Sequence, residues 1–119
     1  MMNDAKFYQM IHLHSGVDVW PDFVPEDATL PAISYVQISD KFNRVLEGSK
    51  SAKSDTWRLS LVCNDLEELE QLVNLVETID NTVKDGYQRI FVIYRKRVPR
   101  ISDEQITFTY LIDLETYGD

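Results

Sequence analysis

The side chains that could do chemistry are few and scattered. His12 and His14 are the two histidines, and they lie in a segment whose apolar residues recur at helical spacing. On a helix, residues two positions apart point to different sides, so this pair cannot chelate one metal ion; only on a strand would they share a face. No cysteine or acidic cluster lies nearby to complete a ligand set. We therefore expect no metal site.

Cys63 is the single cysteine, and it ends a segment of alternating apolar residues where a small buried thiol fits. A nucleophilic thiol needs an electropositive setting and a base, but Asn64 and Asp65 follow it. One cysteine also excludes an internal disulfide framework. The sequence has no glycine-rich phosphate loop, no Gly-x-Ser-x-Gly elbow and no His-Glu-x-x-His motif. We expect a protein that is not an enzyme and binds no cofactor.

Charge is the most uneven feature of the sequence. Its 119 residues include 12 Lys and Arg against 20 Asp and Glu, a net charge of −8. This surplus of negative charge argues against a partner bound through phosphates, and we expect no sequence-specific nucleic-acid binding. Four cations fall within six positions: Arg95, Lys96, Arg97 and Arg100. Six carboxylates gather in one earlier segment: Asp65, Glu67, Glu68, Glu70, Glu77 and Asp80.

This split of charge has two interpretations. The simpler one is that the two clusters are solvated faces of a small protein. The other is self-complementarity, in which the basic cluster of one copy meets the acidic helix of the next. Such head-to-tail contacts close into rings.

The first half of the chain predicts one helix and three strands. A helix capped by Asn3 or Asp4 ends near Gly16, and a brief edge strand precedes Pro21. Three of the four prolines fall from Pro21 to Pro31, which predicts an extended, ordered loop. Strands follow at 32–39 and 56–63, joined by a long polar hairpin tip over 40–55.

The second half predicts one helix and two strands. The helix is capped by Asn64 or Asp65 and closed by Asp85 and Gly86. Its apolar stripe consists of Leu66, Leu69, Leu72, Val73, Val76, Ile79 and Val83. The segment 89–98 is apolar on both faces, which indicates a central strand, and 105–114 alternates as the last strand, with Ile106 facing inward.

These elements predict a single α+β domain over residues 1–119, with the order α-β-β-β-α-β-β. We expect a mainly antiparallel sheet of about five strands, with two helices on one face. No run approaches ~18 apolar residues, and the first residues lack a basic segment followed by an apolar core. We therefore expect neither a membrane span nor a secretory signal.

A short amphipathic helix leads into a proline-rich acidic stretch and the strand LPAISY, from Leu30 to Tyr35. A polar hairpin tip, an alternating strand from Trp57 and a helix opened by Asn or Asp follow. In this succession of motifs the chain resembles the tail-completion and tail-terminator proteins of long-tailed bacteriophages. Because the two closing strands also fit, the resemblance covers nearly the whole chain. Pro31 and Trp57 are its most telling positions.

The resemblance implies a structural protein of the virion tail, assembled in the host cytoplasm. Such proteins cap the tail tube as a ring, often a hexamer, and join it to the head. The implied partners are further copies of the chain, the tail-tube protein and a head-completion protein, with no membrane. The hairpin tip (Phe42, Arg44 and Leu46) would reach a neighbouring subunit or the tube, and the stretch from Arg95 to Arg100 would lie near a subunit contact.

Two other classes of function stay open. One is a small acidic interaction module of the immunity or inhibitor type, which would present Glu67, Glu68 and Glu70 to a basic partner. The other is a small α+β enzyme, which would need a concave pocket holding a titratable group with a shifted pKa.

Overall fold

The computed structural model describes residues 4–44, 51–83, 87 and 89–118. The elements are α1 (Asp4–Ser15), β1 (Asp18–Pro21), β2 (Ala32–Arg44), β3 (Ser51–Cys63), α2 (Leu66–Glu77), β4 (Arg89–Val98) and β5 (Phe108–Gly118). Their order confirms the predicted α-β-β-β-α-β-β arrangement and the α+β class.

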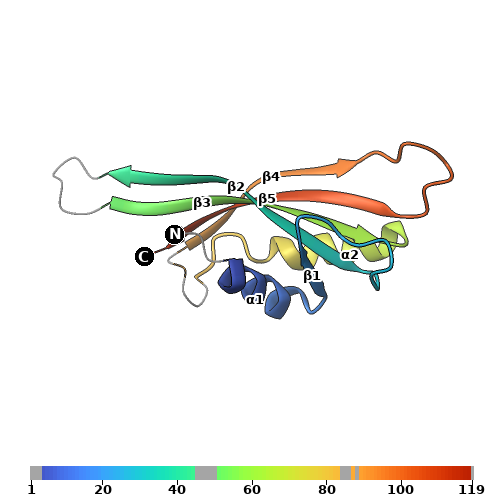
Figure 1. Ribbon diagram of the computed structural model, residues 1–119, viewed down its shortest axis with the longest axis horizontal. Helices are drawn as coiled ribbons and strands as arrows, with labels where there is room; N and C mark the ends of the chain where they lie inside the picture. The colour runs from blue at the N-terminus through green and yellow to red at the C-terminus, as the bar shows by residue number, and fades with distance from the viewer. Residues whose placement is uncertain (1–3, 45–50, 84–86, 88, 119) are drawn as a thin grey trace.

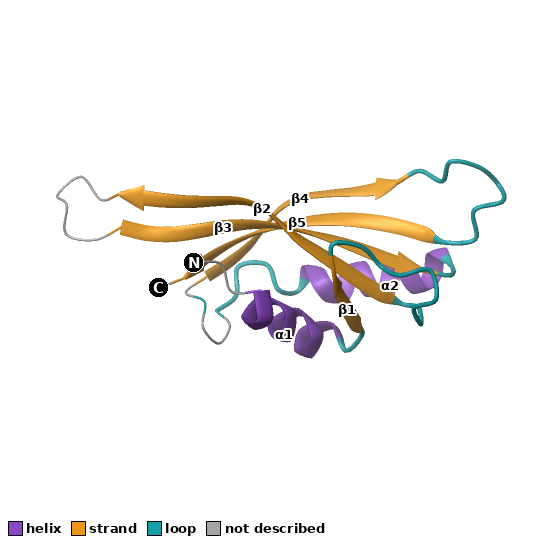
Figure 2. Cartoon of the chain, in the orientation of Figure 1, coloured by secondary structure: helices purple, strands orange, loops and turns teal. Residues whose placement is uncertain are grey.

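The five strands form one sheet in the order β1-β2-β3-β5-β4. Strand β1 pairs with β2 in parallel, and the other neighbours are antiparallel. Both helices cover the same face of this sheet, as Figure 2 shows. The opposite face, which carries neither helix, is called the open face below.

The core lies between the helices and the sheet. At its centre the ring of Phe7, from α1, stacks on the ring of Trp57, from β3, with centroids 4.0 Å apart and planes 4° from parallel. Both side chains are almost completely buried. The Trp57 indole Nε1 also donates a hydrogen bond to the Thr116 hydroxyl at 3.1 Å. This contact therefore ties α1 to the two central strands, β3 and β5.

The predicted central position of the strand 89–98 is wrong, because β4 lies at the edge of the sheet and β3 at its centre. Ile90 is buried, but Ile93 and Tyr94 are exposed. Apolar residues on both faces of β4 thus do not mean burial on both faces. Strand β5 lies between β4 and β3. It pairs with β3 from Lys53↔Gly118 to Cys63↔Phe108.

The two strands of the β2–β3 hairpin extend further than predicted, so fewer residues lie between them than in the predicted 40–55 tip. Pairing continues to Arg44↔Ser51, so most of the predicted 40–55 tip is strand. The molecule measures 56 × 25 × 22 Å. In Figure 1 the ends of β2 and β3 at Arg44 and Ser51 lie at one end of the long axis, and the loop between β4 and β5 lies at the other.

Two further boundaries differ from prediction. Helix α2 ends at Glu77 with Thr78 as its C-cap, well before Asp85 and Gly86, which lie outside the described residues. Asn81 takes a positive φ of 57°, and Thr82 then forms a bridge with Ile90. Val83 is consequently exposed instead of belonging to the apolar stripe. Strand β5 begins at Phe108, which leaves Ile106 in the preceding loop and exposed.

Candidate functional site

Parts of the predicted basic and acidic clusters line the two walls of one groove. In β4, Arg95 pairs with Ile112 and Arg97 with Tyr110, which places both arginines on the face that carries the helices. Helix α2 stands opposite them, and the space between has a volume of about 650 Å³. We call it the α2–β4 groove. Its apolar lining consists of Leu66, Leu69, Val73 and Tyr110, and its charged lining of Glu70, Glu77, Arg95, Lys96 and Arg97.

An ion pair joins the two walls of the α2–β4 groove. Nη1 of Arg95 lies 2.6 Å from Oε1 of Glu77. This hydrogen bond and the charge of Glu77 raise the pKa of Arg95 above its ordinary value. One cation of the basic cluster thus pairs with the acidic helix of its own chain. Arg95 and Glu77 are therefore already paired within one chain, and only the other charged residues of the two clusters are left for contacts between copies.

The remaining predicted site residues are distributed unevenly around the groove. Lys96, Arg97 and Arg100 are exposed, and Glu70 is exposed on the α2 wall. Glu67 is exposed and Glu68 half-buried in the first turn of α2, away from the groove lining. Phe42 and Arg44 lie in β2, paired with Lys53 and Ser51 of β3, and Leu46 lies outside the described residues.

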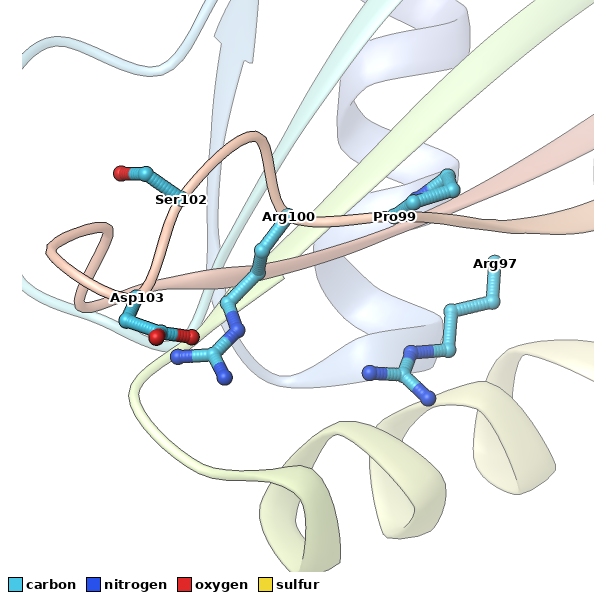
Figure 3. A pocket seen from close by; sticks show the side chains of 5 residues that line it. All are labelled: Arg97, Pro99, Arg100, Ser102 and Asp103. Atoms are coloured by element: carbon cyan, nitrogen blue, oxygen red, sulfur yellow. The ribbon is translucent and has the colours of Figure 1, made fainter.

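Two arginines continue the β4 wall into the β4–β5 loop. Arg97, Pro99, Arg100, Ser102 and Asp103 line a pocket of about 360 Å³, which we call the arginine pocket. Figure 3 shows the guanidinium groups of Arg97 and Arg100 pointing to the same side. The Asp103 carboxylate lies beside the Arg100 guanidinium in this view. Both cations also lie over the Phe108 ring, at 5.8 and 4.7 Å from its centroid. Contact with this ring holds both charges in place at the surface.

The proline-rich segment between β1 and β2 is an ordered loop that lines a pocket on the open face of the sheet together with residues 104–107. We call residues 22–31 the proline loop. Asp22, at φ 70°, donates its backbone N–H to Tyr35 O at 2.9 Å, and Ala28 N–H donates to Pro25 O at 3.1 Å. Phe23 is 70% exposed, and Glu26 and Asp27 are exposed beside it. The sequence signal for this feature is a phenylalanine among prolines and carboxylates, which the prediction treated as a connection only.

The open face of the sheet holds a second ion pair. Arg58 donates two hydrogen bonds to the Asp113 carboxylate, from Nε at 2.8 Å and from Nη2 at 2.9 Å. The Asp113 side chain is 8% exposed and that of Arg58 39%. The hydrogen bonds to Asp113 raise the pKa of Arg58. Asp113 lies on the open face, opposite Arg58 in the β3–β5 ladder, and the arginine side chain covers it.

The candidate chemical residues have structural partners. His12 Nδ1 bonds with Val17 O at 2.8 Å, and His14 Nε2 with Leu75 O at 3.0 Å, which joins α1 to α2. Burial, with smaller contributions from Glu68 and Asp65, raises the pKa of the Cys63 thiol to about 11. Within the described residues, no three His, Cys, Asp or Glu side chains form a group that could hold a metal ion.

Among the helices that the structure describes, none has the length and apolar character needed to cross a membrane. The sequence matches no protein-family model, and no curated protein matches it significantly.

Proposed function

We propose that this chain is a tail-terminator or tail-completion protein of a bacteriophage or prophage. It would cap the tail tube as a ring of identical subunits and join that tube to the head. What carries this proposal is the arrangement of elements. A short helix leads through β1 and the ordered proline loop into a long β2–β3 hairpin, and α2 then separates this part from the closing β4–β5 hairpin.

The surface of the molecule supports a role in assembly. The β4–β5 loop, at one end of the 56 Å molecule, carries Ile101 and Ile106, which are 93% and 78% exposed. Large apolar side chains exposed together at one end of a protein are typical of contact surfaces. We assign this end to contact with the tube or the head-completion protein.

The competing function is the acidic interaction module, which would bind a basic target through Glu67, Glu68 and Glu70. Glu67 and Glu70 are exposed on α2, which this function requires. Reversing Glu67 and Glu68, which lie outside the groove lining, to Lys would weaken such binding, while tube capping would change little. The two functions therefore differ in one variant.

The experiment has two steps. First, the genes that flank this one are read, and the proposal expects a tail-tube gene and a head-completion gene beside it. Second, that tube protein is coexpressed with and without this chain, and the particles are measured by negative-stain electron microscopy. We expect tubes that stop at a defined length with a ring at one end. Tubes of unchanged length without a terminal ring would refute the proposal.

A further inference from the structure

From the arrangement of charge and apolar surface, we infer that the proline loop of one copy docks into the α2–β4 groove of a second copy. In this contact Phe23 enters the apolar part of the groove, and Glu26 and Asp27 meet Arg97 and Arg100 in the arginine pocket. The inference rests on the proposed function, since it names the surfaces through which the ring would form.

The occupant of the groove must be apolar at one point and acidic beside it. On the α2 side, the apolar lining of the groove is Leu66, which is 44% exposed, with the buried side chains of Leu69 and Val73 beneath it, 2% and 7% exposed. On the β4 side, Lys96 and Arg97 line the groove, and Arg97 also lines the adjoining arginine pocket with Arg100. An aromatic anchor with neighbouring carboxylates therefore complements this surface.

The proline loop supplies both parts of this requirement, an exposed aromatic residue and two neighbouring carboxylates. Phe23 is the most exposed aromatic residue among those described, and Glu26 and Asp27 follow it by three and four positions. The loop is ordered by the Asp22 N–H to Tyr35 O bond and by the turn from Pro25 to Ala28. Docking an ordered loop loses little conformational entropy, which favours association.

Within one chain the proline loop lines a pocket with Ser60 and Thr109 on the open face of the sheet. The groove residues Arg95 and Arg97 lie on the other face, which carries the helices. The loop leaves from β1, at one edge of the sheet, whereas β4 forms the opposite edge. In Figure 1 the loop lies on the near side of the molecule and α2 on the far side. A loop on one face of the sheet and a receptor on the other face give head-to-tail contacts between copies, and such contacts close into rings or continue as filaments.

The charges of the groove also set the orientation of the loop. Glu70 and Glu77 stand on the α2 wall, so the carboxylates of an incoming loop are repelled from α2 and attracted to β4. Glu77 is already paired with Arg95. The loop carboxylates therefore meet Arg97 and Arg100, while the apolar anchor faces Leu66, Leu69 and Val73.

The test uses two complementary charge reversals, with association measured by sedimentation velocity over a range of concentrations. The loop variant is Glu26→Arg with Asp27→Arg, and the receptor variant is Arg97→Glu with Arg100→Glu. Each variant alone places like charges in the contact, so we expect association weakened at least about tenfold. Mixed in equal amounts, the two variants offer matched charges at every contact, and we expect oligomers of alternating copies.

The charge reversals have a matched control. Asp18→Arg with Glu67→Arg reverses two exposed charges outside the groove and should leave association unchanged.

The apolar anchor is tested by a separate pair of variants. Phe23→Ser should weaken association about tenfold or more. Leu13→Ser, at a residue that is 73% exposed on α1, should leave it unchanged.

Failure of this inference differs from failure of the proposed function. Oligomers that survive both charge reversals, or a mixture that stays dissociated, would overturn the docking of the loop. A wild-type protein that is monomeric at every concentration would overturn it too. The tube-capping experiment then decides separately whether the chain terminates tails.

Discussion

Nη1 of Arg95 lies 2.6 Å from Oε1 of Glu77, and this contact joins the edge strand β4 to helix α2. Members of a basic and an acidic cluster that are separate in the sequence thereby line opposite walls of one groove. The charge of Arg95 is therefore paired within its own chain. Lys96, Arg97 and Arg100 remain on the outer surface, where a second copy can reach them.

The Arg58–Asp113 pair should matter more for stability than the Arg95–Glu77 pair. Arg58→Ala leaves the Asp113 carboxylate, 8% exposed, without its two hydrogen bonds. We expect a loss of about 1–2 kcal/mol in the free energy of unfolding, measured by urea denaturation. Glu77→Gln is the control. It should leave the midpoint almost unchanged, because Arg95 is largely exposed. Equal losses for both variants would contradict this ranking.

The stack of Phe7 on Trp57 should contribute most to the core. Phe7→Ala removes a completely buried ring at 4.0 Å from the indole and leaves a cavity. We expect a loss of about 3–5 kcal/mol, measured by chemical denaturation. Tyr8→Ala changes the next residue of α1, which is 38% exposed, and should cost much less. A small effect at Phe7 would show that α1 does not depend on this contact.

Helix α2 should depend on Asp65 and not on Asn64. The Asp65 carboxylate accepts a hydrogen bond from the backbone N–H of Glu68 at 2.7 Å, as an N-cap does. Asp65→Ala should therefore lower the free energy of unfolding by about 1 kcal/mol. Asn64→Ala, at the other residue that the sequence allowed as the cap, should leave the thermal midpoint nearly unchanged. Circular dichroism during thermal unfolding measures both.

Alkaline pH should destabilise the fold through Cys63. Burial, with help from Glu68 and Asp65, raises the pKa of this thiol to about 11, whereas in the unfolded chain it ionises near 8.5. Between these values the unfolded chain loses the proton and the folded chain keeps it, so stability falls as pH rises. Below about pH 8 the thiol is protonated in both the folded and the unfolded chain, so no stability is lost through its ionisation.

The comparison of wild type with Cys63→Ala isolates this thiol. Burial also raises the pKa of Tyr87, and that contribution is common to both proteins. We expect the melting temperature of the wild type to fall more steeply from about pH 8 to about pH 10.5. Parallel pH profiles would show that Cys63 does not titrate differently in the folded and unfolded states.

The order of the elements was predictable because α2 and β3 each bury one apolar face with a clear period. Leu69, Leu72 and Val76 recur at helical spacing and are buried, while Trp57, Leu59 and Leu61 alternate and are buried as well. What periodicity could not give was length beyond the core. Strands β2 and β3 continue through a polar sequence, because ladder hydrogen bonds do not require apolar side chains.

The position of β4 and the site itself depend on tertiary arrangement. Ile93 and Tyr94 make β4 look buried on both faces, but only β5 pairs with it along its length. The pairing of Arg95 with Glu77 joins residues 18 positions apart through the packing of α2, which no local pattern encodes. Phe23 was missed because a loop residue carries no periodic signal.

Self-association is the central claim, and native mass spectrometry of the purified protein over a range of concentrations tests it most directly. We predict one discrete closed oligomer, a hexamer by the resemblance to tail terminators, that dissociates as ionic strength rises because charged contacts are screened. A species of single-chain mass at every concentration and salt level would contradict the claim.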